Sequence, residues 1–237
     1  MAFTYKGVHA RDMHLHVLNE LEFESTTREL DVITVPGRDG ELIMDKGRYE
    51  TVVRKFPCRL RLPENANLEA HISQMHQCLI DEAGLHDLLL DHEPDFVYRA
   101  RIDNGVTTTQ ILSHLGKVVI HFRLHPIKYL TTGLREVPVT PGTNLVHPFG
   151  TTAKPIIRIV GGGNMTLNIG GRPLVLQGIA GGCLIDSQTQ TITSLDGRIT
   201  LFDRMYSPFP VLRPGNNVIT FPNHIQVFIT PRWGALV

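Results

Sequence analysis

The sequence predicts a mainly β protein with a single α-helix, and three observations support this fold class. Apolar and polar residues alternate along residues 52–62, with Phe56, Cys58, Leu60 and Leu62 on one side, as in a half-buried strand. Residues 131–237 carry short apolar runs separated by Gly- and Pro-rich turns at intervals of roughly 8–12 residues, a spacing typical of an antiparallel β-sandwich. The 21 Gly and 15 Pro residues accompany few long apolar helical patterns.

A six-residue turn, Val35-Pro36-Gly37-Arg38-Asp39-Gly40, is the most informative local feature of the first half. The runs Glu29–Thr34 and Glu41–Asp45 on either side of it have strand character. Proline presets φ at an early turn position, and the two glycines supply the positive φ values that close a hairpin. No catalytic motif surrounds the turn. We therefore expect a long charged hairpin that contacts a neighbouring subunit, and we take the six turn residues as the candidate site.

The first half also contains the one segment that predicts a helix. Asn67 is a suitable N-cap, Gly84 can end the helix, and four apolar residues fall on one stripe between them: Leu68, Ile72, Met75 and Leu79. We expect strands before it, where Leu15 and Val17 alternate with histidines, and after it over residues 85–102 and 118–124. Residues 107–109 are expected in a loop or an exposed strand.

The composition changes after about Leu130, which predicts two domains, residues 1–130 and 131–237. The second part contains no convincing helical pattern and seven short apolar runs that we expect to be strands: residues 156–160, 165–169, 174–176, 183–186, 191–193, 217–221 and 226–230. Residues 1–130 carry 15 Lys and Arg against 19 Asp and Glu, a net of −4, and residues 131–237 carry 8 against 4, a net of +4. This asymmetry fits two domains with different neighbours, and it also fits chance scatter of surface charges.

Composition argues against several classes of protein. The formal net charge is zero, so nothing in it indicates nonspecific nucleic-acid binding. The three cysteines (Cys58, Cys78 and Cys183) are odd in number and far apart, which predicts small buried side chains rather than disulfides or a zinc site. The first residues predict no secretory signal. No stretch reaches the roughly 18 apolar residues that a membrane helix needs.

The polar residues do not assemble into a recognisable catalytic or metal site. His14 and His16 would share one face of a strand and His71 and His76 lie five residues apart on the helix, but no cysteine or carboxylate pattern completes either pair. A glycosidase would need two carboxylates in one cleft, and the second half offers only Glu136, Asp186, Asp196 and Asp203. Ser25, Ser113 and Ser207 lack a nucleophile motif, and Gly161-Gly162-Gly163 lacks the lysine of a phosphate loop. We therefore expect no enzyme activity, metal or cofactor.

Five aromatic residues near the end leave a carbohydrate-binding module open as an alternative. Phe221 and Phe228 have strand periodicity and are expected in the core, whereas Trp233 could cover the core or line an exposed face. Tyr206 and Phe209 complete the set. An adhesin that recognises host cell-wall saccharide would use such aromatic rings, but simple packing in the core is the favoured explanation.

Several short motifs, taken in order, resemble one protein family. The first half contains Phe3-x-Tyr5-x-Gly7, the Pro36–Gly40 turn and Gly47-Arg48-Tyr49-Glu50. The second half contains Tyr206-Ser207-Pro208-Phe209-Pro210, then Arg213-Pro214-Gly215-Asn216 and the terminal Thr230-Pro231-Arg232-Trp233. Across essentially the whole chain, this order and spacing resembles the distal tail proteins of siphophages that infect Gram-positive bacteria.

The resemblance implies a structural protein of the virion, made in the host bacterial cytoplasm. It implies a tail-tube-like N-terminal β domain with one helix that forms a hexameric ring, and a galectin-like C-terminal sandwich. The implied partners are the tail tube protein, the tail-tip hub protein and receptor-binding proteins, with no membrane, and DNA would pass through the lumen without specific binding. On this basis we expect residues 22–57 to form an intersubunit ribbon, and an acidic N-terminal half to reduce the attraction of phosphate to the lumen.

Overall fold

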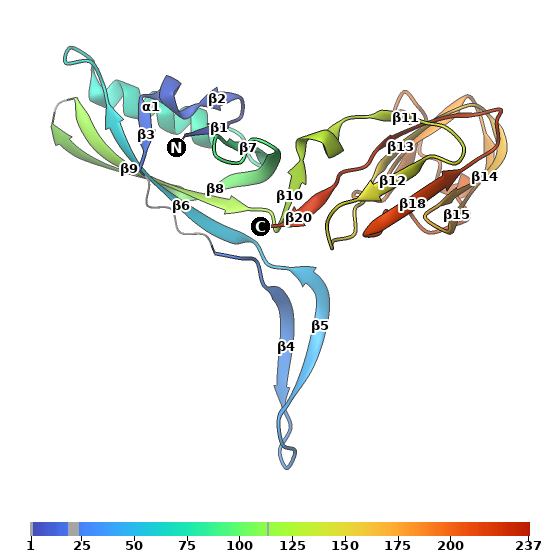
Figure 1. Ribbon diagram of the computed structural model, residues 1–237. Helices are drawn as coiled ribbons and strands as arrows, with labels where there is room; N and C mark the ends of the chain where they lie inside the picture. The colour runs from blue at the N-terminus through green and yellow to red at the C-terminus, as the bar shows by residue number, and fades with distance from the viewer. Residues whose placement is uncertain (1, 19–23, 113) are drawn as a thin grey trace. The chain divides into compact units, whose positions relative to one another are not determined.

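A computed structural model describes residues 2–18, 24–112 and 114–237 and shows a mainly β protein with one α-helix (Figure 1). The chain divides into two compact units. The N-terminal unit runs to Lys128 and also includes Leu236–Val237, and the C-terminal unit is Tyr129–Ala235. The chain passes from the first unit to the second in β10 (Ile127–Leu130) and returns in β20 (Gly234–Leu236). The functional roles expected for the two predicted domains stay predictions.

One antiparallel sheet forms most of the N-terminal unit, with the strand order β2-β1-β7-β8-β9-β6-β3. The strands are β1 (Phe3–Tyr5), β2 (Val8–His9), β3 (Leu15–Val17), β6 (Val52–Arg61), β7 (His86–Leu90), β8 (Phe96–Leu112) and β9 (Leu115–Leu124). Along strand β6, buried residues alternate with residues that are partly or fully exposed, and the strand pairs with β9 from Val52↔Leu124 to Arg61↔Leu115. The period-2 pattern therefore predicted β6 correctly. Residues 107–109, expected in a loop or an exposed strand, belong to the exposed part of β8.

The core of this unit lies between one face of the sheet and the helix α1 (Leu68–Ile80). The Asn67 side chain caps the helix by accepting a hydrogen bond from the Ala70 amide at 3.1 Å, which confirms the predicted start. Leu68, Met75 and Leu79 are buried along one stripe of the helix. The rings of Phe3, Phe56 and Phe122 meet edge to face with centroids 5.3–5.6 Å apart, so β1 is held against β6 and β9.

The C-terminal unit is an antiparallel sandwich, as predicted. Its five-stranded sheet has the order β11-β19-β13-β16-β17 and its four-stranded sheet the order β12-β18-β14-β15. The strands are β11 (Val137–Val139), β12 (Asn144–His147), β13 (Ile156–Val160), β14 (Gly163–Ile169), β15 (Arg172–Ile179), β16 (Gly182–Asp186), β17 (Thr191–Thr193), β18 (Gly215–Thr220) and β19 (Gln226–Thr230). Side chains from both sheets form one core, for example Ile157 and Ile159 with Leu167 and Leu176.

Three predictions about single residues were wrong. Cys78, which was expected to be buried like Cys58 and Cys183, is only partly buried. His14 does not share a strand face with His16, because it ends a short 3-10 helix, Ala10–Met13, in the left-handed conformation with φ 55°. Its ring instead lies 5.2 Å from that of His71. Phe228 is not a core residue, since its neighbours Val227 and Ile229 point into the core and its own ring lies on the outer face under the guanidinium of Arg158.

Candidate interaction surface

The predicted hairpin is present and forms a two-stranded sheet of its own. Strands β4 (Arg28–Thr34) and β5 (Glu41–Tyr49) pair with each other, and within the described residues neither pairs with a third strand (Figure 1). Gly37 and Gly40 adopt φ of +80° and +79°, as the turn requires. A Cβ atom added at either position would meet no atom within 4 Å, so backbone conformation alone favours glycine there.

Both faces of this hairpin expose large apolar side chains. Directly opposite residues share a face, so the pair Val32↔Ile43 lies on one side with Leu30, and the pair Ile33↔Leu42 lies on the other with Met44. Val32, Ile43 and Met44 are more than half exposed. With Val35 at the turn, the hairpin carries seven of the eighteen large exposed hydrophobic side chains in the described part of the chain. We call Arg28–Tyr49 the apolar ribbon.

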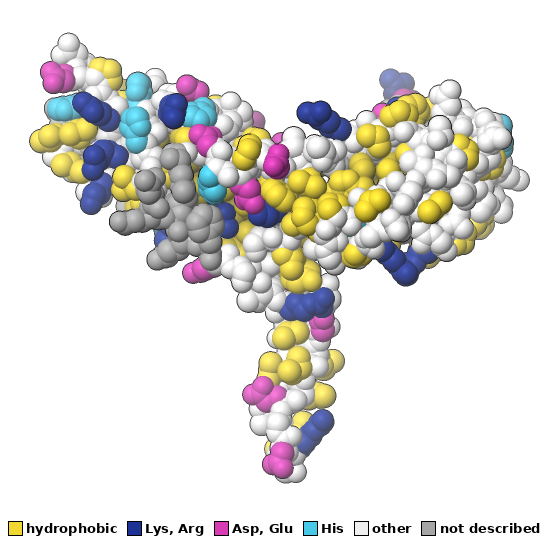
Figure 2. Space-filling model, in the orientation of Figure 1, with side chains coloured by type: hydrophobic (Ala, Val, Ile, Leu, Met, Phe, Trp, Pro, Cys, Tyr) yellow, Lys and Arg dark blue, Asp and Glu magenta, His cyan; other side chains and the backbone are white. Residues whose placement is uncertain are grey.

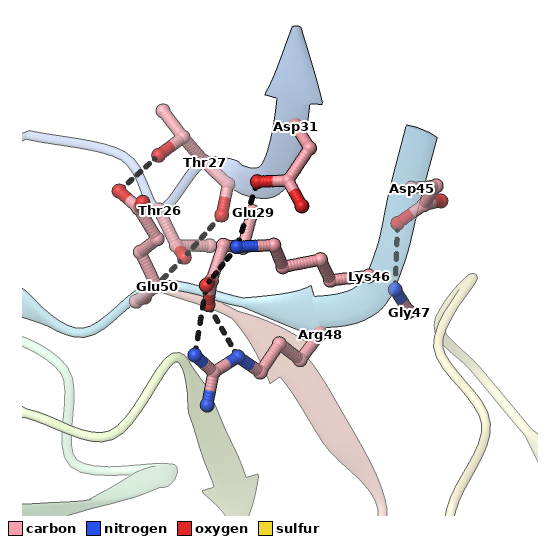
Figure 3. A network of polar contacts seen from close by, with 9 residues as sticks. All are labelled: Thr26, Thr27, Glu29, Asp31, Asp45, Lys46, Gly47, Arg48 and Glu50. Carbon is pink, nitrogen blue, oxygen red and sulfur yellow. Dashed lines mark hydrogen bonds and ion pairs between the residues drawn. The ribbon is translucent and has the colours of Figure 1, made fainter. Parts of the chain in front are cut away.

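A cluster of charged residues fixes the root of the apolar ribbon (Figure 3). The Glu29 carboxylate accepts hydrogen bonds from Arg48 at 2.8 Å and from Lys46 at 3.2 Å, and Lys46 also pairs with Asp31 at 2.8 Å. The hydrogen bonds from Arg48, and next those from Lys46, hold the pKa of Glu29 below its usual range. Between the pairs Arg28↔Tyr49 and Leu30↔Asp45, β5 has two more residues than β4, so β5 bulges there. These contacts hold β4 and β5 together at the root of the apolar ribbon.

The apolar ribbon is shorter than the predicted range of residues 22–57. Residues Val52–Pro57 belong to β6 and pair with β9, so they are part of the main sheet. Thr26 closes the root by donating to the Glu50 carbonyl at 2.7 Å. Residues 22 and 23 lie outside the described residues. The six predicted turn residues lie at the tip, where all of them are exposed.

The four carboxylates of the second half each have a structural partner. Arg158 donates two hydrogen bonds to Glu136, at 2.8 and 2.6 Å, and Arg232 donates two to Asp186, at 2.6 and 3.0 Å. Burial raises the pKa of Asp186, but the hydrogen bonds from Arg232 and the backbone outweigh it, and its pKa lies below the ordinary value. A general acid would need the opposite shift. Asp196 accepts from Ser194 within a turn, and Asp203 pairs with Arg204.

The remaining candidates for chemistry also lie in structural positions. Among the described residues, no group of three or more His, Cys, Asp or Glu side chains could hold a metal ion. Burial raises the pKa of the Cys58 and Cys183 thiols to about 12, which keeps them protonated. In the described part of the chain no helix is long and apolar enough to span a bilayer.

The aromatic residues of the last segment do not form an exposed platform. Trp233 packs against the sandwich core, with its ring 4.8 Å from that of His147. Phe209 and Phe221 are partly buried against the same core. Tyr206, at 62% exposure, is the one ring of the predicted five that is exposed.

The fold is similar to that of solved phage tail proteins. No family model and no curated protein matches the sequence. The crystal structure of the SPP1 Dit protein, described as a paradigm of the hub adsorption apparatus in phages infecting Gram-positive bacteria, aligns with 96% of this chain and 97% of its own at 18% identity and a TM-score of 0.73. A chain of the phage P2 baseplate in its activated conformation aligns with 96% of each chain at 9% identity and a TM-score of 0.52. The protein therefore has the fold of the phage Dit hub protein across both of its units.

Proposed function

We propose that this chain is a noncatalytic structural protein of a phage virion, located at the tail tip. Six copies form a ring at the distal end of the tail tube, and the ring joins the tube to the tail-tip hub protein and to receptor-binding proteins during host attachment. The chain is made in the host bacterial cytoplasm and assembles into the tail there. The likeness in fold to Dit and baseplate chains over nearly the whole length supports this assignment.

The observation that carries the proposal is the apolar ribbon. An isolated two-stranded hairpin is marginally stable in water, and monomeric proteins rarely expose contiguous apolar patches of this kind. Because both faces are apolar, one flat partner surface would leave the other face in water. Head-to-tail contacts between identical subunits, which close into a ring by rotation, can cover the ribbon on both sides.

Light scattering on the purified chain tests the ring. We expect the mass of six copies, or of twelve where rings stack in pairs, and a stable monomer at high concentration would refute the proposal. Deleting Pro36–Gly40 should shift the distribution toward monomer. The matched control deletes Asp196–Arg198 from an exposed turn of the sandwich and should leave the mass unchanged. An equal effect of both deletions would assign the loss to general damage instead of to the ribbon.

A carbohydrate-binding adhesin module is the second candidate, and the burial of its aromatic residues weighs against it. Sugar recognition by stacking needs exposed rings, and Trp233 and Phe221 pack against the core. A glycan array with cell-wall saccharides separates the two functions. Binding at micromolar strength that is lost in Tyr206→Ala would favour the adhesin.

A further inference from the structure

On four strands of the N-terminal unit, almost all of the charged residues are positive. Strands β3, β6, β8 and β9 together contain eight Lys and Arg residues and one acidic residue, Asp103. The acidic balance of the N-terminal half therefore comes from other elements. Figure 2 shows Lys, Arg and His side chains gathered over the part of the N-terminal unit where β6 and β9 lie in Figure 1.

The alternation of the strands directs most of these cations to the face opposite the core. On β6, residues Phe56, Cys58 and Leu60 are buried, so Lys55, Arg59 and Arg61 point outward, and Lys117 does so on β9. The register places His16, Arg59, Lys117 and Thr109 in one row across the four strands. Lys55 lies opposite His121 in a second row. We call Lys55, Arg59, Arg61 and Lys117 the basic face.

The basic face lacks the carboxylates that neutralise cations elsewhere in the unit. Within the described residues, none of its four side chains has an ion pair, whereas the cations at the root of the apolar ribbon pair with Glu29, Asp31 and Asp45. On the outward face of β6, β8 and β9 the acidic residue is Asp103, which is 5% exposed and already accepts two hydrogen bonds from Arg123, at 2.8 and 3.0 Å. On the neighbouring strand β7, Asp87 faces the same way and is paired with Arg99 at 2.9 Å. Arg59 and Lys117 are direct cross-strand neighbours, an arrangement that destabilises a sheet unless an anion lies over it.

We propose that the basic face binds the phosphate backbone of duplex DNA without reading its sequence. The four cations lie on adjacent strands with cross-strand neighbours about 5 Å apart, which matches a polyanion better than a single small anion. Thr107, Thr109 and His16 add the hydroxyl and imidazole donors that commonly contact phosphate oxygens. A protein partner is disfavoured because lysine is depleted at the centres of protein interfaces, which are usually apolar.

The proposal does not depend on ring formation, because it concerns one face of one subunit. It also differs from sequence-specific recognition, since a flat sheet face has no element that enters a groove. If the ring exists, DNA contacts at this face would be weak, exchangeable and set by ionic strength.

Fluorescence anisotropy of the full chain with a labelled 30-base-pair duplex tests the proposal. For four phosphate contacts, log K falls with log salt at a slope of about −3.6, so raising salt from about 50 to 200 mM should weaken binding about 150-fold. Replacing Lys55, Arg59, Arg61 and Lys117 with Gln should abolish most binding and flatten the salt dependence. The control replaces Arg135, Lys154, Arg172 and Arg213, four exposed cations of the sandwich, and should keep the slope.

Folding and mass of both variants complete the test. Removing like charges from the basic face should leave the unfolding midpoint equal or higher, so a loss of DNA binding is not a loss of structure. Undetectable DNA binding by the wild type at 50 mM salt would overturn the proposal, as would equal loss in both variants. A basic-face variant that changes oligomeric mass and keeps DNA binding would assign the face to a protein contact and overturn it too.

Discussion

Removing two apolar side chains from the apolar ribbon should weaken assembly by a calculable amount. Val32 and Ile43 are direct cross-strand partners and are 52% and 59% exposed. Replacing both with Thr retains β-branched side chains, which favour strands, so the hairpin itself should persist. The change therefore tests the apolar contact with a partner and not the fold of the hairpin.

The expected magnitude follows from the exposed surface of the two residues. Together they expose about the area of one full side chain, whose burial contributes about 1.5–3 kcal/mol. Threonine keeps part of that area but adds a hydroxyl that must lose water, so we expect about 2 kcal/mol lost per interface. A closed ring of six forms six interfaces in five association steps, so the loss averages about 2.4 kcal/mol per association step. The midpoint concentration of assembly should therefore rise about 50-fold.

Sedimentation velocity over a dilution series measures that midpoint. The matched control is Val146→Thr with Ile199→Thr, because these sandwich residues are 55% and 61% exposed and belong to the same residue types. The reasoning is refuted if the ribbon variant assembles at the wild-type midpoint with an unchanged circular dichroism spectrum. It is equally refuted if the control variant shifts as far as the ribbon variant.

Three further substitutions test contacts inside the two units. Asp103→Asn should cost about 2 kcal/mol at pH 7 in urea unfolding, because Arg123 loses a charged acceptor. The hydrogen bonds from Arg123 lower the pKa of Asp103, so this contribution is present above the ordinary pKa of Asp and should vanish as pH falls through the lowered value. Asn217→Ala should cost about 3 kcal/mol, because the Asn217 amide donates to three backbone carbonyls and accepts from one backbone amide. Gly133→Ala should destabilise the sandwich and shift the fluorescence of Trp233, since the added Cβ would lie 2.6 Å from the Trp233 backbone nitrogen.

Each of these substitutions has a control of the same type. Asp203→Asn removes an exposed carboxylate and should change stability by less than about 0.5 kcal/mol. Asn216→Ala removes one exposed amide contact next to Asn217. Gly150→Ala adds a methyl group where no atom lies within 4 Å. Equal effects of a substitution and its control would contradict the contact assigned to it.

Local sequence patterns predicted most of the strands and the helix because they report local geometry. The alternation in β6 follows from the two-residue period of a strand, and the helix start follows from the Asn67 cap. The hairpin followed from glycines that the structure places at positive φ. Strands β11 and β12 were missed, because Pro138 and the polar ends of Asn144–His147 interrupt an apolar pattern.

Features that depend on pairing between distant segments were not predicted. One local feature was missed as well, because the end of the 3-10 helix directly before His14 decides whether His14 belongs to a strand. The outward direction of Phe228 depends on which face of β19 meets the other sheet, and either register satisfies its periodicity. The register of four strands brings the cations of the basic face together. A net charge summed along the chain therefore does not reveal this face. The root of the apolar ribbon likewise joins charges that only the pairing of β4 and β5 brings together.

The route of the chain would allow the whole sandwich to be replaced by another domain. The chain enters this unit once, after Lys128, and leaves it once, before Leu236. On the sandwich side the Leu130 amide donates to the Trp233 carbonyl at 2.9 Å, and on the other side the Val237 amide donates to the Pro126 carbonyl at 3.0 Å. Both junctions are therefore neighbours in space, so a replacement module needs only adjacent ends to fit between them. Grafting at these two points would replace the sandwich and leave the N-terminal core residues intact.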